Sequence, residues 1–207
     1  MISVIIKPSG EDSVDNYTVE HVKEELRGIY GAETLVGDWF TTETKKNNSF
    51  ICFVESEGVF SDGYFLQISE FLNSNKMYRK MAMISPVTSV IRWNNKLYGY
   101  HLNNDTISPT YAPKSTSQHQ IQMGFVPGSV IRKSTFNKIK DSILLQTEDL
   151  FLLSIDVSLA FWDHGDGNSV HLLPNIGYAT MDDTIESPFV YVGIPDRIKE
   201  KFKKEFI

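Results

Sequence analysis

The sequence has one cysteine, no long apolar stretch and no recognisable leader. The single cysteine, Cys52, excludes an internal disulfide, and its place in the apolar run FICFV predicts a buried core residue. The scarcity of cysteine favours a cytoplasmic protein. No apolar stretch approaches the roughly 20 residues that span a bilayer, and the opening residues lack a basic leader with a small-residue cleavage site. We therefore expect a cytoplasmic protein without a membrane partner.

Low-complexity segments are also missing, and one sign of charge prevails only mildly. The 207 residues are 41% apolar and 22% charged, which is typical of a globular protein, and we expect a single domain over 1–207. The net charge of −6 disfavours indiscriminate binding to nucleic acid. Two basic stretches, 131–140 and 196–206, stand out locally. The second predicts a terminal amphipathic helix whose lysines are either solvated or face an anionic partner.

The first third of the chain alternates between strand and helix patterns. Continuous apolar runs predict strands at 2–6, 33–38 and 48–55, and helical spacing predicts a helix at 18–31 and another that Asp62 caps. This order predicts a parallel sheet covered by helices. Further patterns predict strands at 81–93, 96–102 and 124–136, a very apolar helix at 148–162, and late strands in VHLLP and FVYVGIP.

Polar residues gather where the first three predicted strands end. The loop KPSG follows Ile6, Asp38 closes the second strand, and Glu55 and Glu57 follow the third. In open α/β sheets, ligands bind beyond the carboxyl ends of the strands. Three independent strand ends with polar or acidic residues therefore predict a binding site at this edge.

Glu55 and Glu57 are one residue apart. Residues i and i+2 of an extended segment point to the same side, so both carboxylates can face one cation. Carboxylate oxygens suit Mg²⁺ or Mn²⁺, which usually take one or two carboxylates together with phosphate and water. The alternative is that both are solvated acids at the edge of a strand.

Five segments resemble, in order, the family-2-type glycosyltransferases. These segments are MISVIIKPSG, ETLVGD, FICFVESEGVFSDGYFLQISEFL, MGFVPGSVIRKSTFNKI, and TEDLFLLSIDVSLAFWDHG followed by VHLLP. The resemblance implies an α/β, GT-A-like fold, with a mostly parallel central sheet, helices on both faces and a smaller mixed acceptor-side region. It also implies a nucleotide-sugar-binding half over 1–93 and an acceptor and catalytic half over 94–207.

The resemblance assigns roles to particular residues. Glu55-Ser56-Glu57 stands in place of the family's Asp-x-Asp motif, which implies a site for Mn²⁺ or Mg²⁺, and Asp149 takes the place of the catalytic base. The implied donor-binding residues are Pro8, Ser9, Asp38, Gly128 and Ser129, and the implied acceptor-side residues are Glu148, Trp162 and Arg132.

Most of these residues also have a structural explanation. Glu148 and Asp149 suit the positive end of a helix that Thr147 caps. Pro8-Ser9-Gly10 and Pro127-Gly128 are typical of turns, and Trp162 is typical of a core. Arg132 suits the phosphates of a donor or of nucleic acid equally well.

The resemblance predicts a metal-dependent glycosyltransferase that uses a nucleotide sugar, with a UDP-sugar favoured. The acceptor would be a glycan or a hydroxymethylated base in phage DNA, in which case the enzyme works in the host cytoplasm. Glu-x-Glu and the small size favour an alternative, a GT-A-like module that binds a nucleotide sugar without catalysis. A third interpretation is a nucleotidyltransferase, which would release pyrophosphate.

Overall fold

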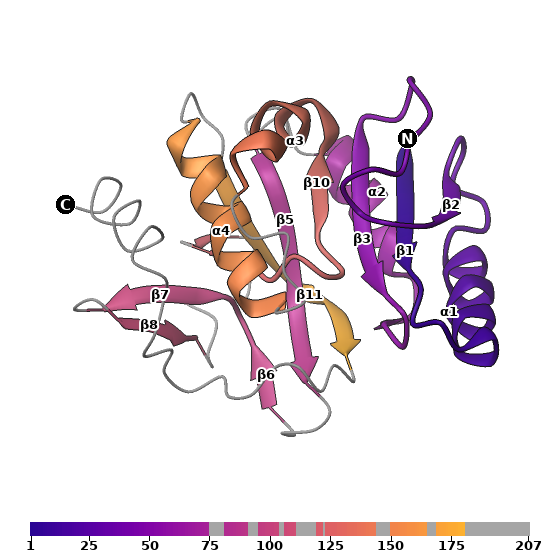
Figure 1. Ribbon diagram of the computed structural model, residues 1–207, viewed down its shortest axis with the longest axis horizontal. Helices are drawn as coiled ribbons and strands as arrows, with labels where there is room; N and C mark the ends of the chain where they lie inside the picture. Colours follow the sequence, from indigo (N-terminus) through magenta and orange to yellow (C-terminus); the bar gives the residue numbers. More distant parts are fainter. Residues whose placement is uncertain are drawn as a thin grey trace.

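The computed structural model describes residues 1–74, 81–90, 95–103, 106–110, 119–121, 123–143, 150–164 and 169–180. Its centre is a sheet in the order β2-β1-β3-β10-β5-β11-β4 (Figure 1). Strand β6 also pairs with β5, β9 pairs with β11, and β7 and β8 form a separate hairpin. The strands are β1 (Ile2–Lys7), β2 (Glu33–Val36), β3 (Phe50–Glu55), β4 (Val59–Phe60), β5 (Met81–Val90), β6 (Asn95–Leu97), β7 (Tyr100–Asn103), β8 (Thr106–Pro109), β9 (His119–Ile121), β10 (Val130–Arg132) and β11 (Ser169–Thr180).

Most strands of the main sheet run in one direction. Strand β1 is parallel to β2 and β3, and β5 is parallel to β11. Strand β10 is antiparallel to both β3 and β5, so it joins two sets of strands that point the same way. Along this path through the described strands, only β10 and β4 run against the others. The predicted mostly parallel sheet is therefore confirmed.

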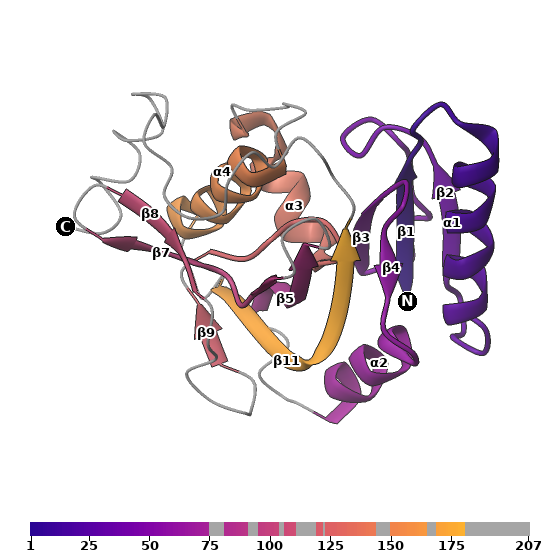
Figure 2. The same ribbon diagram turned by 90° about the horizontal axis from the view of Figure 1, so that it is seen from below.

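Helices cover both faces of the sheet, as predicted (Figure 2). On one face, α3 (Lys133–Ile139) and α4 (Leu150–Asp163) pack against alternate strand residues such as Ile5 and Phe53. On the other face, α1 (Asp12–Glu25) and α2 (Tyr64–Ser74) pack against Val4 and Cys52. A short 3-10 helix, Lys140–Ser142, follows α3. Strands β1 and β3 are apolar at nearly every position because both of their faces are buried.

Cys52 lies in the core between the sheet and helices α1 and α2. It is fully buried, and burial raises the pKa of its thiol because the charged form loses its hydration. The predicted core role of Cys52 is confirmed. Among the described residues, no helix is both long enough and apolar enough to cross a membrane.

Several predicted boundaries were wrong. The first helix begins at Asp12 instead of residue 18, because its polar first turn forms contacts with the loop after β1. The strand predicted at 96–102 breaks at Gly99, whose φ of 110° suits glycine. The strand predicted at 124–136 is confined to β10, and helix α3 begins directly after it.

Helix α2 has a different cap from the one that the sequence suggests. The Glu25 carboxylate, at the end of α1, accepts hydrogen bonds from the backbone N–H groups of Gly63 and Tyr64, over 3.4 and 3.0 Å. A residue distant in sequence therefore satisfies this helix end, while Asp62 was predicted to do so. The predicted strand FVYVGIP and the predicted terminal helix lie outside the described residues.

Tyr178 of β11 fills a space that two glycines leave open. A Cβ atom on Gly128 would overlap the ring of Tyr178, and a Cβ atom on Gly58 would overlap its hydroxyl oxygen. The hydroxyl of the neighbouring Tyr64 donates to the carbonyl of Gly128. Gly128 also adopts a φ of 75°, which disfavours any other residue. These glycines therefore bring three separate segments into contact around one buried ring.

We expect Gly128→Ala to lower the free energy of unfolding by roughly 2–5 kcal/mol, the sum of left-handed strain and overpacking. Gly63→Ala is the matched control, since Gly63 has a φ of 68° and a Cβ atom added there would meet no other atom within 4 Å. We expect the control to lower stability by about 1 kcal/mol, from backbone strain alone. Urea unfolding measures both. Equal losses of unfolding free energy in the two variants would show that the Tyr178 ring moves to accommodate the new Cβ atom at no cost in stability.

Candidate functional site

The carboxyl ends of β1, β2 and β3 lie side by side at one edge of the sheet (Figure 1). Lys7 is in register with Glu55, and Ile6 is in register with Val36. Backbone hydrogen bonds continue past the strand ends, from Gly37 N–H to the Ile6 carbonyl and from Ser56 N–H to the Lys7 carbonyl. The three strand ends that the sequence singled out therefore meet, as their parallel arrangement requires.

One carboxylate ties two of these strand ends together. Asp15, in the first turn of α1, accepts hydrogen bonds from the backbone and hydroxyl of Ser9, over 2.8 and 2.9 Å, and from the N–H of Gly10 at 3.3 Å. It also accepts from the hydroxyl of Ser56. The Ser56 hydroxyl is the largest cause of a lowered pKa at Asp15. Sequence reasoning missed Asp15, whose only signal was its place near a helix start.

The segment Glu55-Ser56-Glu57 is not extended throughout. Strand β3 ends at Glu55, and the N–H of Gly58 donates to the Glu55 carbonyl at 3.1 Å, which closes a tight turn. Glu57 has a φ of 73°, and its N–H donates to the hydroxyl of buried Thr18 at 3.1 Å. The expectation that this pair follows strand alternation was therefore wrong at Glu57. That the two residues share a cation stays a prediction.

Glu55 is half-buried and contacts a tyrosine from the late strand β11. The hydroxyl of Tyr178 donates to its Oε1 at 3.2 Å. Burial raises the pKa of Tyr178 well above its ordinary value, and the charge of Glu55 raises it further. Tyr178 therefore stays protonated at neutral pH and can donate to the carboxylate. Sequence reasoning missed this residue, because only the fold brings it to Glu55.

The side-chain oxygens at this end of the strands suit a cation that also binds a ligand. Within the described ranges, no group of three or more His, Cys, Asp or Glu side chains could hold a metal ion by itself. Mg²⁺ and related ions commonly take one or two protein carboxylates and complete their shell with phosphate and water. Glu55 and the exposed Glu57 fit that arrangement, while a closed, all-protein site does not fit.

The predicted nucleotide-binding residues lie at the same edge and are exposed. Ser9 is held by Asp15, and its hydroxyl oxygen accepts from the N–H of Glu11 at 3.0 Å. Asp38 Oδ1 accepts from the N–H groups of Phe40 and Thr41, over 2.9 and 3.0 Å, and so closes its own turn. The loops of Pro8, Ser9 and Asp38 are thus built by local hydrogen bonds, and their contact with a nucleotide stays a prediction.

Gly128 and Ser129 form the turn that the sequence offered as an alternative. Ser129 is fully buried, and its hydroxyl donates to the carbonyl of Phe125. The N–H of Gly128 donates to the carbonyl of Phe53 at 2.8 Å. Their described contacts are therefore contacts of the core, and a contact with the donor sugar remains untested.

The structure does not bring Arg132 to Glu55. Arg132 pairs with Phe50, the first residue of β3, while Glu55 is the last. Five residues of strand separate the two positions, about 16 Å at 3.3 Å per residue. Glu148 and Asp149 lie outside the described residues, and Trp162 falls within α4, where its side chain is not described.

No family model and no curated protein sequence matches the chain. Among solved structures, A197 from STIV aligns with a TM-score of 0.52 and 11% identity, over 89% of this chain and 87% of A197. S. aureus TarS 1–349 in complex with UDP aligns at 0.47 and 11%, over 86% of this chain and 60% of TarS. The complex with UDP-GlcNAc aligns at 0.46 and 10%, over 100% and 68%.

These likenesses concern the fold. The A197 alignment spans most of both chains, and at 11% identity it shows a shared fold and nothing finer. The TarS alignments have TM-scores below 0.5 and add no argument. Together with the sheet order and the helices on both faces, the A197 alignment supports the α/β fold with a mostly parallel central sheet that the sequence predicts.

Asp15 makes stability at this edge depend on pH. Because the folded state lowers its pKa below the ordinary 3.8, the stabilisation is present above that value and is lost as the pH falls through the folded pKa. We expect Asp15→Asn to be less stable than the wild type at pH 7, with the gap narrowing below pH 3.8. Urea unfolding at several pH values measures this gap.

Asp12→Asn is the matched control, because Asp12 shares the first turn of α1 but makes none of the four hydrogen bonds of Asp15. We expect a clearly smaller loss at pH 7. Identical pH profiles for the two variants would mean that the helix terminus, and not the bonds to Ser9 and Ser56, stabilises the edge.

Proposed function

We propose that the chain is a glycosyltransferase that moves a sugar from a nucleotide-sugar donor to an acceptor hydroxyl. The observation that carries the proposal is the meeting of Ser9, Asp38 and Glu55 at one edge of a parallel sheet. Ligands of open α/β sheets bind beyond the carboxyl ends of their strands. The order of motifs along the chain and the GT-A-like fold support the same conclusion.

In this proposal the donor diphosphate binds above the turn at Glu55. Glu55 and Glu57 would hold Mn²⁺ or Mg²⁺, and the bound ion would supply positive charge that stabilises the departing diphosphate. Tyr178 holds the carboxylate of Glu55 in place through its hydroxyl. Asp15 fixes the adjacent Ser56 and the loop of Pro8 and Ser9, so the donor meets an ordered surface.

The nucleoside would lie against the loops after β1 and β2. The exposed Asp38 offers a carboxylate to a base N–H or a ribose hydroxyl. We propose a UDP-sugar as the donor. The acceptor hydroxyl would lose its proton to Asp149, with Glu148 and Trp162 beside it. The acceptor is a glycan or a hydroxymethylated base in DNA, and a DNA acceptor would bind less tightly as salt is added.

A second candidate is a module that binds a nucleotide sugar without turning it over. One observation favours it: Glu57 departs from the extended geometry that would direct both carboxylates to one cation. Donor consumption with an acceptor panel separates the candidates, because a module binds the donor and releases no nucleoside diphosphate.

If the enzyme proposal is right, Glu55→Gln abolishes Mn²⁺-dependent transfer, because the neutral amide is a poor ligand for a hard cation. Chelation of the ion from the wild type should have the same effect. Calorimetric titration of Mn²⁺ in the presence of UDP checks the cause directly. Glu20→Gln, at an exposed salt bridge with Lys23, is the control and should bind and turn over like the wild type.

Variants of two buried tyrosines test whether the Glu55 carboxylate must be held in place to bind Mn²⁺. Tyr178→Phe keeps the ring but removes the donor to Glu55, and we expect Mn²⁺ affinity to fall about 10- to 100-fold. Tyr64→Phe removes a hydroxyl that donates to the Gly128 carbonyl, and we expect unchanged Mn²⁺ affinity. If the two variants changed Mn²⁺ affinity equally, the role of Tyr178 would be in packing alone.

Asp149→Asn tests the proposed base. A positioned carboxylate that accepts a proton in the transition state contributes about 100- to 10,000-fold to the rate. We expect the variant to lose transfer by that factor, while donor affinity and the melting temperature stay unchanged. Near-full turnover would refute the assignment, and a wild type that binds donor without turnover would favour the module.

A further inference from the structure

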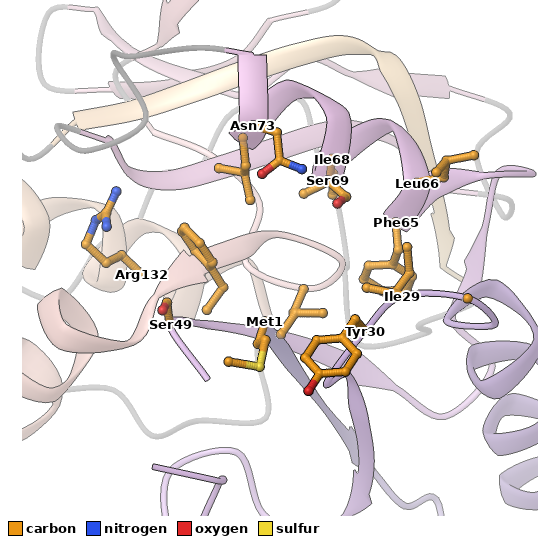
Figure 3. A pocket seen from close by; sticks show the side chains of 14 residues that line it. Met1, Ile29, Tyr30, Ser49, Phe65, Leu66, Ile68, Ser69, Asn73 and Arg132 are labelled. Carbon is orange, nitrogen blue, oxygen red and sulfur yellow. The ribbon is translucent and has the colours of Figure 1, made fainter. Parts of the chain in front are cut away.

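A cavity of about 870 Å³ lies at the amino ends of β1 and β3, the opposite end of these strands from Glu55. Figure 3 shows the cavity from close by. The first residues of β1 and β3, one side of α2 and the segment after α1 form its walls. Nothing in the proposed transfer uses this cavity. Its lining consists of Met1, Ile2, Gly28, Ile29, Tyr30, Ser49, Phe50, Phe65, Leu66, Ile68, Ser69, Leu72, Asn73 and Arg132.

Large apolar side chains are exposed around the cavity. Five large hydrophobic residues are exposed in the described part of the chain, and three of them line it: Met1 at 48%, Tyr30 at 90% and Leu66 at 53%. Single exposed apolar residues are ordinary, but a group around a concave surface is typical of a binding site. The volume also falls in the range of pockets for small molecules, about 300–1,000 Å³.

Arg132 is the one charged side chain among the 14 residues that line the cavity, and no carboxylate is among them. This local excess of positive charge contrasts with the net charge of −6. The Nε–H of Arg132 donates to the Met81 carbonyl at 3.1 Å, and its guanidinium carbon lies 5.3 Å from the centre of the Phe50 ring. These two contacts hold the guanidinium at the cavity wall, and guanidinium groups suit the binding of carboxylates and phosphates.

We propose that this cavity binds a small amphiphilic anion, with an aliphatic or aromatic body and one carboxylate or phosphate head. The body would pack on the apolar rim formed by Tyr30 and Leu66, and the head would pair with Arg132. Ser49, Ser69 and Asn73 add hydrogen-bonding groups that fix the ligand's orientation. The proposal does not rest on the transferase proposal, because it uses other residues at the other end of the sheet.

Decanoate and 1-decanol test the charge of the ligand, because they share a chain length and differ in the head. We expect one decanoate per protein by calorimetric titration, and at least about tenfold weaker binding of 1-decanol, given the strength of charge-assisted hydrogen bonds. Arg132→Met keeps an unbranched side chain over Phe50. It should weaken decanoate about tenfold and leave 1-decanol unchanged.

Leu66→Asp tests the apolar rim without touching the hydrogen bond of Arg132. A carboxylate at this position repels the anionic head and removes apolar contact, so we expect decanoate binding to fall more than about tenfold. Val36→Asp is the matched control. Val36 is 54% exposed, against 53% for Leu66, but does not line the cavity, and its variant should bind like the wild type.

Three outcomes would overturn the proposal. Decanoate binding that is equally weakened by Leu66→Asp and Val36→Asp would indicate nonspecific adsorption. Equal affinity for decanoate and 1-decanol, with no effect of Arg132→Met, would refute an anion site. The third outcome has two parts: decanoate does not bind, and sedimentation shows a dimer that Leu66→Asp dissociates. This outcome would show that a second copy of the chain covers the rim.

Discussion

The proposed donor edge depends on the seating of Tyr178. Its ring occupies space that Cβ atoms on Gly58 and Gly128 would fill, and its hydroxyl reaches Glu55 at 3.2 Å. The contact joins three segments: the turn after β3, the turn before β10, and the late strand β11. Because protein cores are packed to the density of crystals, none of these segments can shift without the others. A carboxylate at the rim of the sheet is thus held in place by residues from both halves of the chain.

The two ends of the sheet have contrasting chemistry. At the carboxyl ends of β1 to β3, Asp15 and Asp38 organise polar loops through local hydrogen bonds. At the amino ends, apolar side chains surround a cavity, and Arg132 is the one charged side chain among its described lining residues. We propose an anionic ligand at each end, held by different interactions. At the carboxyl ends a cation would be shared with a diphosphate, and at the amino ends a guanidinium would bind the anion beside an apolar surface. Strand β3 spans the distance between them, so the two sites share a scaffold without sharing a residue.

The sequence was most informative where a local pattern determines structure. The apolar runs of β1 and β3 predicted buried parallel strands, and their ends correctly located a polar edge. The sequence was less informative where residues that are distant in sequence determine the local structure. Glu57 takes its left-handed conformation in a turn that closes beneath Tyr178, and α2 is capped by Glu25 from another helix. Asp15 has only its place near a helix start as a local signal, and Tyr178 has none, because their partners Ser56 and Glu55 reach them only through the tertiary fold. Arg132, which the resemblance assigns to the acceptor side, pairs with Phe50 at the other end of β3 from Glu55, and its predicted role stays untested.

The geometry of Glu55 and Glu57 bears on how a cation would be held. One carboxylate is half-buried and fixed by Tyr178, and the other is exposed on a left-handed turn. Such a pair lacks the ligands to enclose Mg²⁺ or Mn²⁺ by itself, so a donor diphosphate has to complete the shell. In the proposed site, metal and donor would stabilise each other's binding, since each would supply ligands or charge that the other needs. This coupling is common to a transferase and to a module that only binds the donor. The two candidates therefore agree on the edge at Glu55, and they part at the acceptor, where an enzyme must also remove a proton.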